Sequence, residues 1–174
     1  MSTSVAVPIE GSNIPPLRNE RAGKYLTFHL GTEEFGIQVL KIREIMGIQE
    51  ITMVPQTPGW MKGVINLRGK VIPVIDLRQK FGMPAVPYNQ RTCIIVAQVE
   101  IGSEQILMGL VVDEVSEVVN IAASEIEDAP SFGSNVPTPY ILGMAKQKGK
   151  VKILLDIDRA LSSGELDSVQ GSLQ

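Results

Sequence analysis

An internal repeat constrains the fold of this 174-residue chain more than any other feature. Residues 63–77, which read GVINLRGKVIPVIDL, recur without a gap at residues 143–157 as GMAKQKGKVKILLDI. The two copies share two glycines at matched spacing, a Lys-Val step and an apolar run that closes on an aspartate. These shared positions are what a strand, a turn and a second strand need in order to fold. Asn66 and Arg68 are not shared, so they are the first candidates for a functional role.

Each half of the chain also begins with a predicted β-hairpin. Residues 25–30 are predicted to form a strand, residues 31–34 a turn of suitable composition, and residues 35–39 a returning strand with alternating apolar residues. The second half repeats this order, with a strand at residues 94–101, a turn at 102–105 and a returning strand at 106–112. An internal repeat of this length, made of short β-branched segments separated by Gly or Pro, predicts two tandem barrels of about five strands each. A unit of about 70 residues buries little apolar surface alone. We therefore expect the two units to pack against each other and to leave a seam between them.

Few helices are expected. Short helices are predicted at residues 77–81 and 157–161, each capped by the aspartate that precedes it, Asp76 or Asp156. Residues 37–45 are ambiguous, because their apolar spacing fits a strand at first and a helical turn later.

Composition places the chain among ordinary globular proteins, with 44% hydrophobic and 20% charged residues. A net charge of -3 argues against a nucleic-acid binder, which needs a basic surface for affinity. No apolar run approaches the roughly 20 residues of a membrane helix, and the N-terminus lacks the order of a signal peptide. A single cysteine, Cys93, cannot form an internal disulfide, so we expect a cytoplasmic protein.

The chain shows no pattern of catalytic or cofactor-binding residues. One histidine, His29, and one cysteine cannot supply a zinc site, and no phosphate-binding or dinucleotide-binding motif is present. His29 lies in a predicted strand beside Phe28 and Leu30, and alternation points it outward. We therefore expect a protein that is not an enzyme and that has no cofactor and no metal.

Arg68 has two interpretations. It can be a solvated charge in a turn, as most arginines beside a glycine are. Alternatively, a tight turn between two apolar strands fixes it on a rigid support, where its planar guanidinium suits a partner's carboxylates. Arginines surrounded by apolar residues are enriched among binding hot spots.

Six segments, taken in order, resemble the CheW-like family of bacterial chemotaxis coupling proteins. They are residues 31–37 (GTEEFGI), 40–45 (LKIREI), 58–63, 66–69 (NLRG), 72–78 (IPVIDLR) and 109–113 (GLVVD). The resemblance implies two interlocked SH3-like five-stranded β-barrels packed around a shared core, with short helices. It also implies a noncatalytic adaptor that bridges the cytoplasmic tips of methyl-accepting chemoreceptors to the histidine kinase CheA. The kinase's regulatory domain would dock on it, and partners would recruit it from the cytoplasm to receptor arrays.

The resemblance assigns candidate binding residues position by position. The residues matching the receptor-binding side of the family are Arg68, Asn66, Ile42, Glu44, Gly63 and Val118. An amphipathic receptor helix would place apolar residues in the seam, while Arg68 and Glu44 fix its register by charge. Exposed apolar strand ends suited to docking of the kinase regulatory domain are expected at Ile51, Met53 and Val71.

The expected domain boundaries follow from the repeat and the resemblance. Residues 1–22 are expected to form a flexible N-terminal arm, residues 23–161 the CheW-like domain, and residues 162–174 a flexible tail. The first barrel is expected at about 36–88, completed by exchanged strands, and the second at about 91–156. The competing interpretations are a CheW-like regulatory module detached from a larger signalling protein and a small β-barrel nucleic-acid binder.

Overall fold

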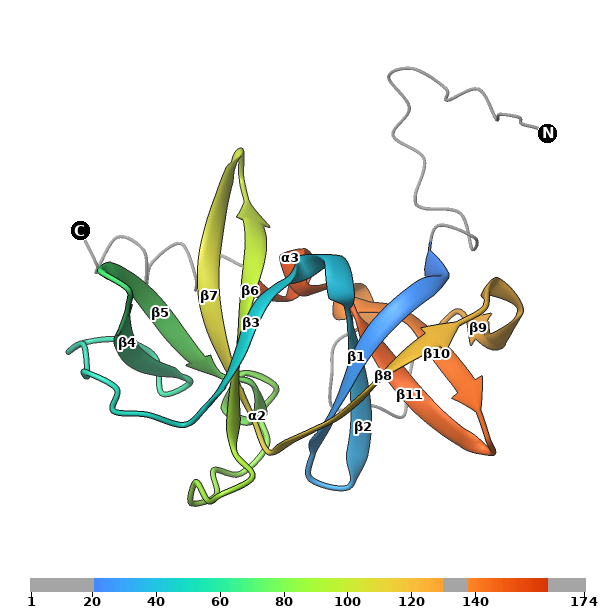
Figure 1. The fold of residues 1–174 in the computed structure, drawn as a ribbon, viewed down its shortest axis with the longest axis horizontal. Coiled ribbons are helices and arrows are strands. Elements are labelled where there is room, and N and C mark those ends of the chain that lie inside the picture. The colour runs from blue at the N-terminus through green and yellow to red at the C-terminus, as the bar shows by residue number, and fades with distance from the viewer. Residues whose placement is uncertain (1–20, 130–137, 163–174) are drawn as a thin grey trace.

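The structure, a computed structural model, describes residues 21–129 and 138–162. These residues form two β-sheets that lie side by side, with short helices between them (Figure 1). The expected tail, apart from Ser162, and the expected arm, apart from residues 21 and 22, lie outside the described residues. The predicted fold class, mainly β with two β subdomains, is confirmed.

Sheet 1 is formed by five strands and sheet 2 by six. In spatial order, sheet 1 contains β3 (Ile42–Gly47), β6 (Cys93–Ile101), β7 (Glu104–Val112), β5 (Lys70–Asp76) and β4 (Met61–Leu67). Sheet 2 contains β8 (Glu114–Ile121), β1 (Gly23–Leu30), β2 (Glu33–Gln38), β11 (Lys150–Leu155), β10 (Ile141–Gln147) and the two-residue strand β9 (Ile126–Glu127).

Each half of the chain supplies its first hairpin to the sheet of the other half. The β1–β2 hairpin joins sheet 2, where Phe35 of β2 pairs in parallel with Ile153 of β11. The β6–β7 hairpin joins sheet 1, where Leu110 of β7 pairs in parallel with Ile75 of β5. The expected first range, about 36–88, contains β3, β4 and β5, and β6 and β7 are the exchanged strands that complete their sheet. The expected second range, about 91–156, includes β6 and β7, which belong to sheet 1, and lacks β1 and β2, which belong to sheet 2. This exchange makes the two subdomains one interlocked unit.

The short helices form where the aspartates of the repeat predict them. Asp76 accepts a hydrogen bond from the backbone of Gln79 at 3.2 Å and caps α2 (Leu77–Lys80). Asp156 caps α3 (Ile157–Leu161) through the backbone of Arg159, also at 3.2 Å. The ambiguous segment contains both structures, since β2 ends at Gln38, a 3₁₀ turn η1 (Val39–Lys41) follows, and β3 begins at Ile42. The 3₁₀ turns η2 (Ala123–Glu125) and η3 (Thr138–Tyr140) complete the fold.

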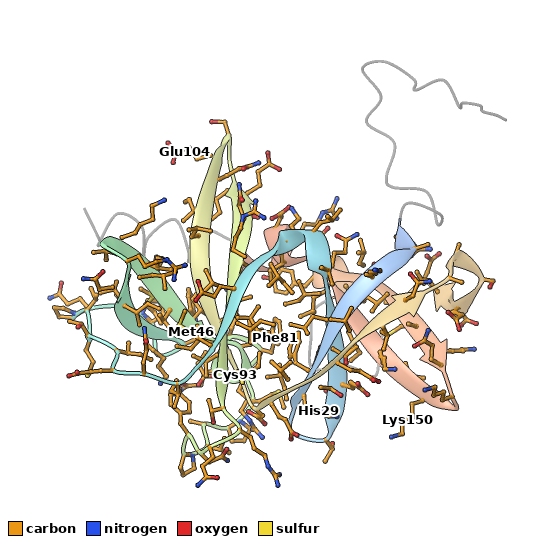
Figure 2. The ribbon with its side chains drawn as sticks, viewed as in Figure 1. His29, Met46, Phe81, Cys93, Glu104 and Lys150 are labelled. Atoms are coloured by element: carbon orange, nitrogen blue, oxygen red, sulfur yellow. The ribbon has the colours of Figure 1, made fainter. Side chains whose placement is uncertain are left out.

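The largest apolar core lies between the two sheets. Among the described residues it contains 21 buried side chains from both subdomains, against 6 in a core belonging to sheet 1 and 5 in one belonging to sheet 2. Phe81, which follows α2, lies near the centre of this shared core (Figure 2). Its ring centroid is 6.2 Å from that of Phe35 and 6.5 Å from that of Tyr140, so aromatic rings from three elements meet there.

Strand β6 is buried on both faces, which explains why its sequence does not alternate between apolar and polar residues. Ile94 and Val96 face the core of sheet 1, whereas Ile95 and Ala97 face the shared core. A strand that is buried on both faces reads as a continuous apolar run. Because the shared core is also the largest, most of the buried apolar side chains lie in the core that joins the two subdomains.

Arg21, which the sequence places in the arm, is anchored to sheet 2. Its side chain is 8% exposed, and its Nη1 donates to the carbonyl oxygen of Leu142 at 2.9 Å and to Asp128 at 3.2 Å. The hydroxyl of fully buried Tyr25 donates to the carbonyl oxygen of Arg21 at 2.6 Å. These bonds fix the start of the described chain beside β10.

Replacing Tyr25 with Phe should change how stability depends on pH. Burial raises the pKa of Tyr25 to about 12, an effect that the charge of Arg21 and a hydrogen bond with Gln38 partly oppose. An unfolded tyrosine titrates near pH 10, so the wild type should lose stability as pH rises from about 10 towards 12. At neutral pH, Tyr25→Phe should cost about 1 kcal/mol of unfolding free energy, the usual value of one hydrogen bond.

Urea unfolding of both proteins between pH 7 and pH 11.5 measures this. The wild type should lose stability more steeply than the variant above about pH 10. Tyr88, whose pKa is also raised by burial and by Asp76, affects both proteins equally. Parallel curves would contradict the account of Tyr25.

Candidate functional site

Arg68 lies at the tip of the β4–β5 hairpin, in a two-residue turn with Gly69. Both residues have positive φ, 51° for Arg68 and 87° for Gly69, as a type I′ turn requires. The side-chain oxygen of Asn66 accepts a hydrogen bond from the backbone N–H of Gly69 at 2.8 Å. Asn66 therefore stabilises the turn, and the Arg68 side chain extends from it 73% exposed.

The second copy of the repeat has the same turn with a different side chain. Lys148 and Gly149 connect β10 to β11 with φ values of 52° and 75°. The shared glycine is thus explained by backbone geometry, since a positive φ suits glycine best. The change from Arg68 to Lys148 alters the chemistry at the tip without altering the turn.

Arg68 forms an ion pair with Glu44 of β3. The Nη2 atom of Arg68 contacts Oε1 of Glu44, and Nη1 lies 3.5 Å from Oε2. The hydrogen bond from Arg68 lowers the pKa of Glu44, and the same bond raises the pKa of Arg68. Strands β3 and β4 are at opposite edges of sheet 1, so the sheet curls enough for this pair to span its edges.

A groove of about 670 Å³ lies beside this pair; we call it the Arg68 groove. Its lining residues are Arg43, Glu44, Leu67, Arg68, Lys70, Val71, Ile72, Pro73, Val96, Gln98, Gln105, Ile106 and Leu107. It contains three basic residues and one acidic residue on a chain whose net charge is -3. Val71, 67% exposed, adds an apolar surface beside the charges. The groove therefore suits a partner that has both apolar and acidic side chains.

Part of this groove was not predicted from the sequence. Lys70 and Arg43 were not singled out, although both contribute to its positive charge. Lys70 belongs to the Lys-Val step that both copies share, so comparison of the copies marks it as scaffold. Arg43 lies inside the segment of ambiguous periodicity, which gave no indication of where its side chain points.

Gly63 is buried, and its position is explained by close packing of the backbone. Its φ is 141°, and a Cβ atom there would lie 2.0 Å from the carbonyl oxygen of Thr52. This proximity allows two backbone hydrogen bonds between Thr52 and Val64, at 2.9 and 2.8 Å. Gly63 therefore positions the segment that contains Ile51 and Met53.

Ile51 and Met53 line a second depression, of about 350 Å³, which we call the Met53 hollow. Its other lining residues are Lys62, Asp76, Gln79, Ala85, Val86, Pro87 and Tyr88. Met53 is 83% exposed, and the hydroxyl of Tyr88 donates to the buried carboxylate of Asp76 at 2.8 Å. The three candidate kinase contacts are thus divided, because Val71 lines the Arg68 groove instead.

The candidate receptor residues are only partly brought together. Glu44 and Arg68 touch, and Asn66 supports their turn. Ile42 begins β3 and packs partly against the shared core. Val118, 55% exposed, lies on β8 at the edge of sheet 2 and does not line the Arg68 groove.

No group of three or more potential metal ligands occurs within residues 21–129 and 138–162. Over the same residues, no helix has the length and apolar character needed to span a membrane.

Comparisons with known proteins agree on one family. A family model described as the CheW-like domain matches residues 24–165. The chemotaxis protein CheW of Klebsiella aerogenes is 40% identical over 156 residues, covering 89% of this chain and 92% of that protein. The chemotaxis protein CheW of Bacillus subtilis is 33% identical over 138 residues, covering 79% and 86%. The crystal structure of the scaffolding protein TtCheW from Thermoanaerobacter tengcongensis superposes with a TM-score of 0.73 at 33% identity, covering 83% of this chain and 95% of that one.

Replacing Gly63 with Ala should destabilise the fold by about 2 kcal/mol or more. The new Cβ would collide with the Thr52 carbonyl oxygen at a backbone angle that side chains rarely adopt. Amide hydrogen exchange at Thr52 and Val64 should accelerate, and chemical denaturation should give the loss of stability. The matched control is Gly59→Ala, where a Cβ would meet nothing within 4 Å and the change should stay within about 0.5 kcal/mol. Equal stability of the two variants would refute this explanation of Gly63.

Proposed function

The chain belongs to the CheW-like family of noncatalytic chemotaxis adaptors, and we propose that it joins methyl-accepting chemoreceptors to the histidine kinase CheA. The observation that carries the proposal is the Arg68 groove, where a rigid exposed arginine lies beside apolar residues and an excess of positive charge. A separate exposed apolar surface at Met53 supports a second partner. An adaptor needs two such surfaces that can be occupied at the same time.

We propose that a helix of the receptor's cytoplasmic tip binds along the Arg68 groove and the seam. An amphipathic helix would place apolar side chains against Val71 and Leu107 and carboxylates near Arg68 and Lys70. Glu44 already neutralises part of the Arg68 charge in the free protein. A receptor carboxylate must therefore share or replace Glu44, which makes the ion pair sensitive to the position of the helix.

The other candidate receptor residues support this binding mode in different ways. Asn66 would act by holding the turn, and Gly63 by fixing the adjacent strand, since neither offers a large contact surface. Ile42 and Val118 lie on β3 and β8 and would supply apolar contacts on the two sides of the seam.

We propose that the regulatory domain of the kinase docks at the Met53 hollow through Ile51 and Met53. Both residues lie on a segment that two backbone hydrogen bonds hold against β4. Met53 is exposed and Ile51 is half-buried against the core of sheet 1, so the apolar surface that they offer has a fixed position. Val71 remains a proposed kinase contact, although it lies in the Arg68 groove and would be shared with the receptor. In the cell, the protein would remain in the cytoplasm and reach receptor arrays through these two partners.

Arg68→Ala should weaken binding of a receptor cytoplasmic fragment by about 1–3 kcal/mol, or about 5- to 150-fold, the scale of a hot-spot truncation. The fold should be unaffected because the side chain is largely exposed. Calorimetric titration of the fragment measures the change. The matched control is Lys148→Ala, which alters the same turn in the second copy and should leave affinity unchanged. Unchanged affinity in Arg68→Ala would exclude Arg68 from the receptor site.

Binding of the kinase regulatory domain should slow amide exchange around Ile51 and Met53, because docking would exclude water from the Met53 hollow. Exchange measured by mass spectrometry with and without the domain locates the contact. Met53→Asp should weaken this binding about tenfold or more by placing a charge in an apolar contact. Protection confined to sheet 2 would show that the kinase contact lies elsewhere.

A further inference from the structure

Two polar clusters lie where the chain crosses between the sheets. The described chain makes this crossing twice, from sheet 2 to sheet 1 through η1 and back through one residue, Asp113, between β7 and β8. At each crossing, a charged residue forms an ion pair with one of the short helices α2 and α3. Neither cluster was predicted from the sequence.

The Asp113 cluster consists of Asp113, Arg78 and Gly31. Both carboxylate oxygens of Asp113 lie 3.0 Å from Nε of Arg78. Arg78 is on α2, the helix that follows β5 of sheet 1. One of these oxygens also accepts a hydrogen bond from the backbone N–H of Gly31 at 2.7 Å, at the turn of the β1–β2 hairpin of sheet 2. The ion pair is mostly shielded, with side-chain exposures of 14% for Arg78 and 27% for Asp113. A single carboxylate thus binds groups from both subdomains.

The Asp158 cluster consists of Asp158, Lys41 and Glu100. Asp158 is on α3, the helix that follows β11 of sheet 2. Its Oδ2 lies 2.6 Å from Nζ of Lys41, the last residue of η1. Its Oδ1 accepts a hydrogen bond from the backbone N–H of Glu100 in β6 of sheet 1, at 2.8 Å. Here the carboxylate belongs to the helix, and it binds a crossing residue and the exchanged β6–β7 hairpin of the other sheet.

The two clusters occupy related places in the repeat with their charges reversed. Arg78 and Asp158 are each the second residue of their helix, α2 or α3. In the first cluster the helix supplies the cation and the crossing supplies the carboxylate. In the second the helix supplies the carboxylate and the crossing supplies the cation. The same kind of connection has thus been made twice with different residues.

These clusters can fix the relative rotation of the two sheets, which the shared core cannot. Apolar burial is non-directional and depends on area, so it holds two sheets together without specifying their relative rotation. Hydrogen bonds to carboxylates are directional, and charged donors strengthen them. Partial burial shields both ion pairs from the water that weakens exposed pairs.

We propose that the Asp113 and Asp158 clusters fix the relative orientation of the two subdomains and thereby position the receptor site. The inference rests on the proposed function, because the strands that leave the two crossings are β3 and β8. These strands contain the proposed receptor residues Ile42, Glu44 and Val118. A change at either crossing would move one of these strands relative to the other, although the changed residue is not itself a proposed receptor contact.

Distances between spin labels can test this directly. Labels at Glu104→Cys and Lys150→Cys, in a Cys93→Ser background, report on sheets 1 and 2, since Glu104 begins β7 at the top of sheet 1 and Lys150 begins β11 at the lower right, in sheet 2 (Figure 2). Lys41→Glu, which places two carboxylates together, should broaden the distance distribution or shift it by more than its original width. Lys41→Glu combined with Asp158→Lys should restore part of the original distribution, because it re-forms the ion pair but leaves the Glu100 N–H without its carboxylate acceptor. The matched control is Lys146→Glu, which breaks a 2.8 Å pair with Glu127 inside sheet 2 and should change nothing.

Circular dichroism of each variant establishes that it is folded. If Lys41→Glu fails to fold, Asp158→Asn removes the charge but keeps an acceptor for the Glu100 N–H, and the same broadening is expected. Receptor affinity should fall at least fivefold in the broadened variants and recover in part in the reversed pair. An unchanged distance distribution, or a changed one with full receptor affinity, would overturn the proposal. Failure of the proposed function itself would appear separately, as unchanged receptor affinity in Arg68→Ala.

Discussion

The two halves of the chain exchange their first hairpins, and this exchange determines how both sheets and the shared core form. Because β1–β2 belongs to sheet 2 and β6–β7 to sheet 1, neither sheet can form from its own half of the chain. The exchanged hairpins also supply more than half of the buried residues in the shared core. Units of this size are marginal alone, so the exchange gives two weak barrels one common source of stability. It also creates the two crossings and the seam on which the proposed binding depends.

The repeat separates what the fold requires from what differs between its copies. Gly63 and Gly143 both lie where a Cβ would collide with a neighbouring segment, at Thr52 and at Ile126 of β9 respectively. The two hairpin turns have nearly the same positive φ values. Against this common backbone, the first copy has the Arg68–Glu44 pair. The two copies thus share a backbone and differ at exposed positions, and both proposed binding surfaces lie on or beside sheet 1.

The sequence predicted the elements better than their arrangement. Alternating apolar residues located the first opening hairpin, its recurrence in the second half located the other, and the aspartates of the repeat located both helices and their caps. The parallel pairings of β2 with β11 and of β5 with β7 join residues more than 30 positions apart. Local periodicity contains no information about such pairs, so the hairpin exchange was only partly expected.

The same limit applies to the candidate site. Glu44 and Arg68 were both named, but their contact depends on the curl of sheet 1 and could not be predicted from either segment. The Arg78–Asp113 and Lys41–Asp158 pairs depend on where the crossings lie. Gly63 was named through the resemblance, and only the distance to Thr52 explains it physically. Residue types were thus predictable where a turn or cap requires them, and contacts between distant segments were not.

Residue-resolved urea unfolding tests the central claim, that the two subdomains form a single interlocked unit. Amide NMR signals of Val96, in the core of sheet 1, and Ala145, in the core of sheet 2, report on each subdomain separately. If the exchanged hairpins and the shared core make one unit, both signals should disappear in one transition with the same midpoint and slope. Two separate transitions, with one sheet remaining folded while the other unfolds, would contradict the account.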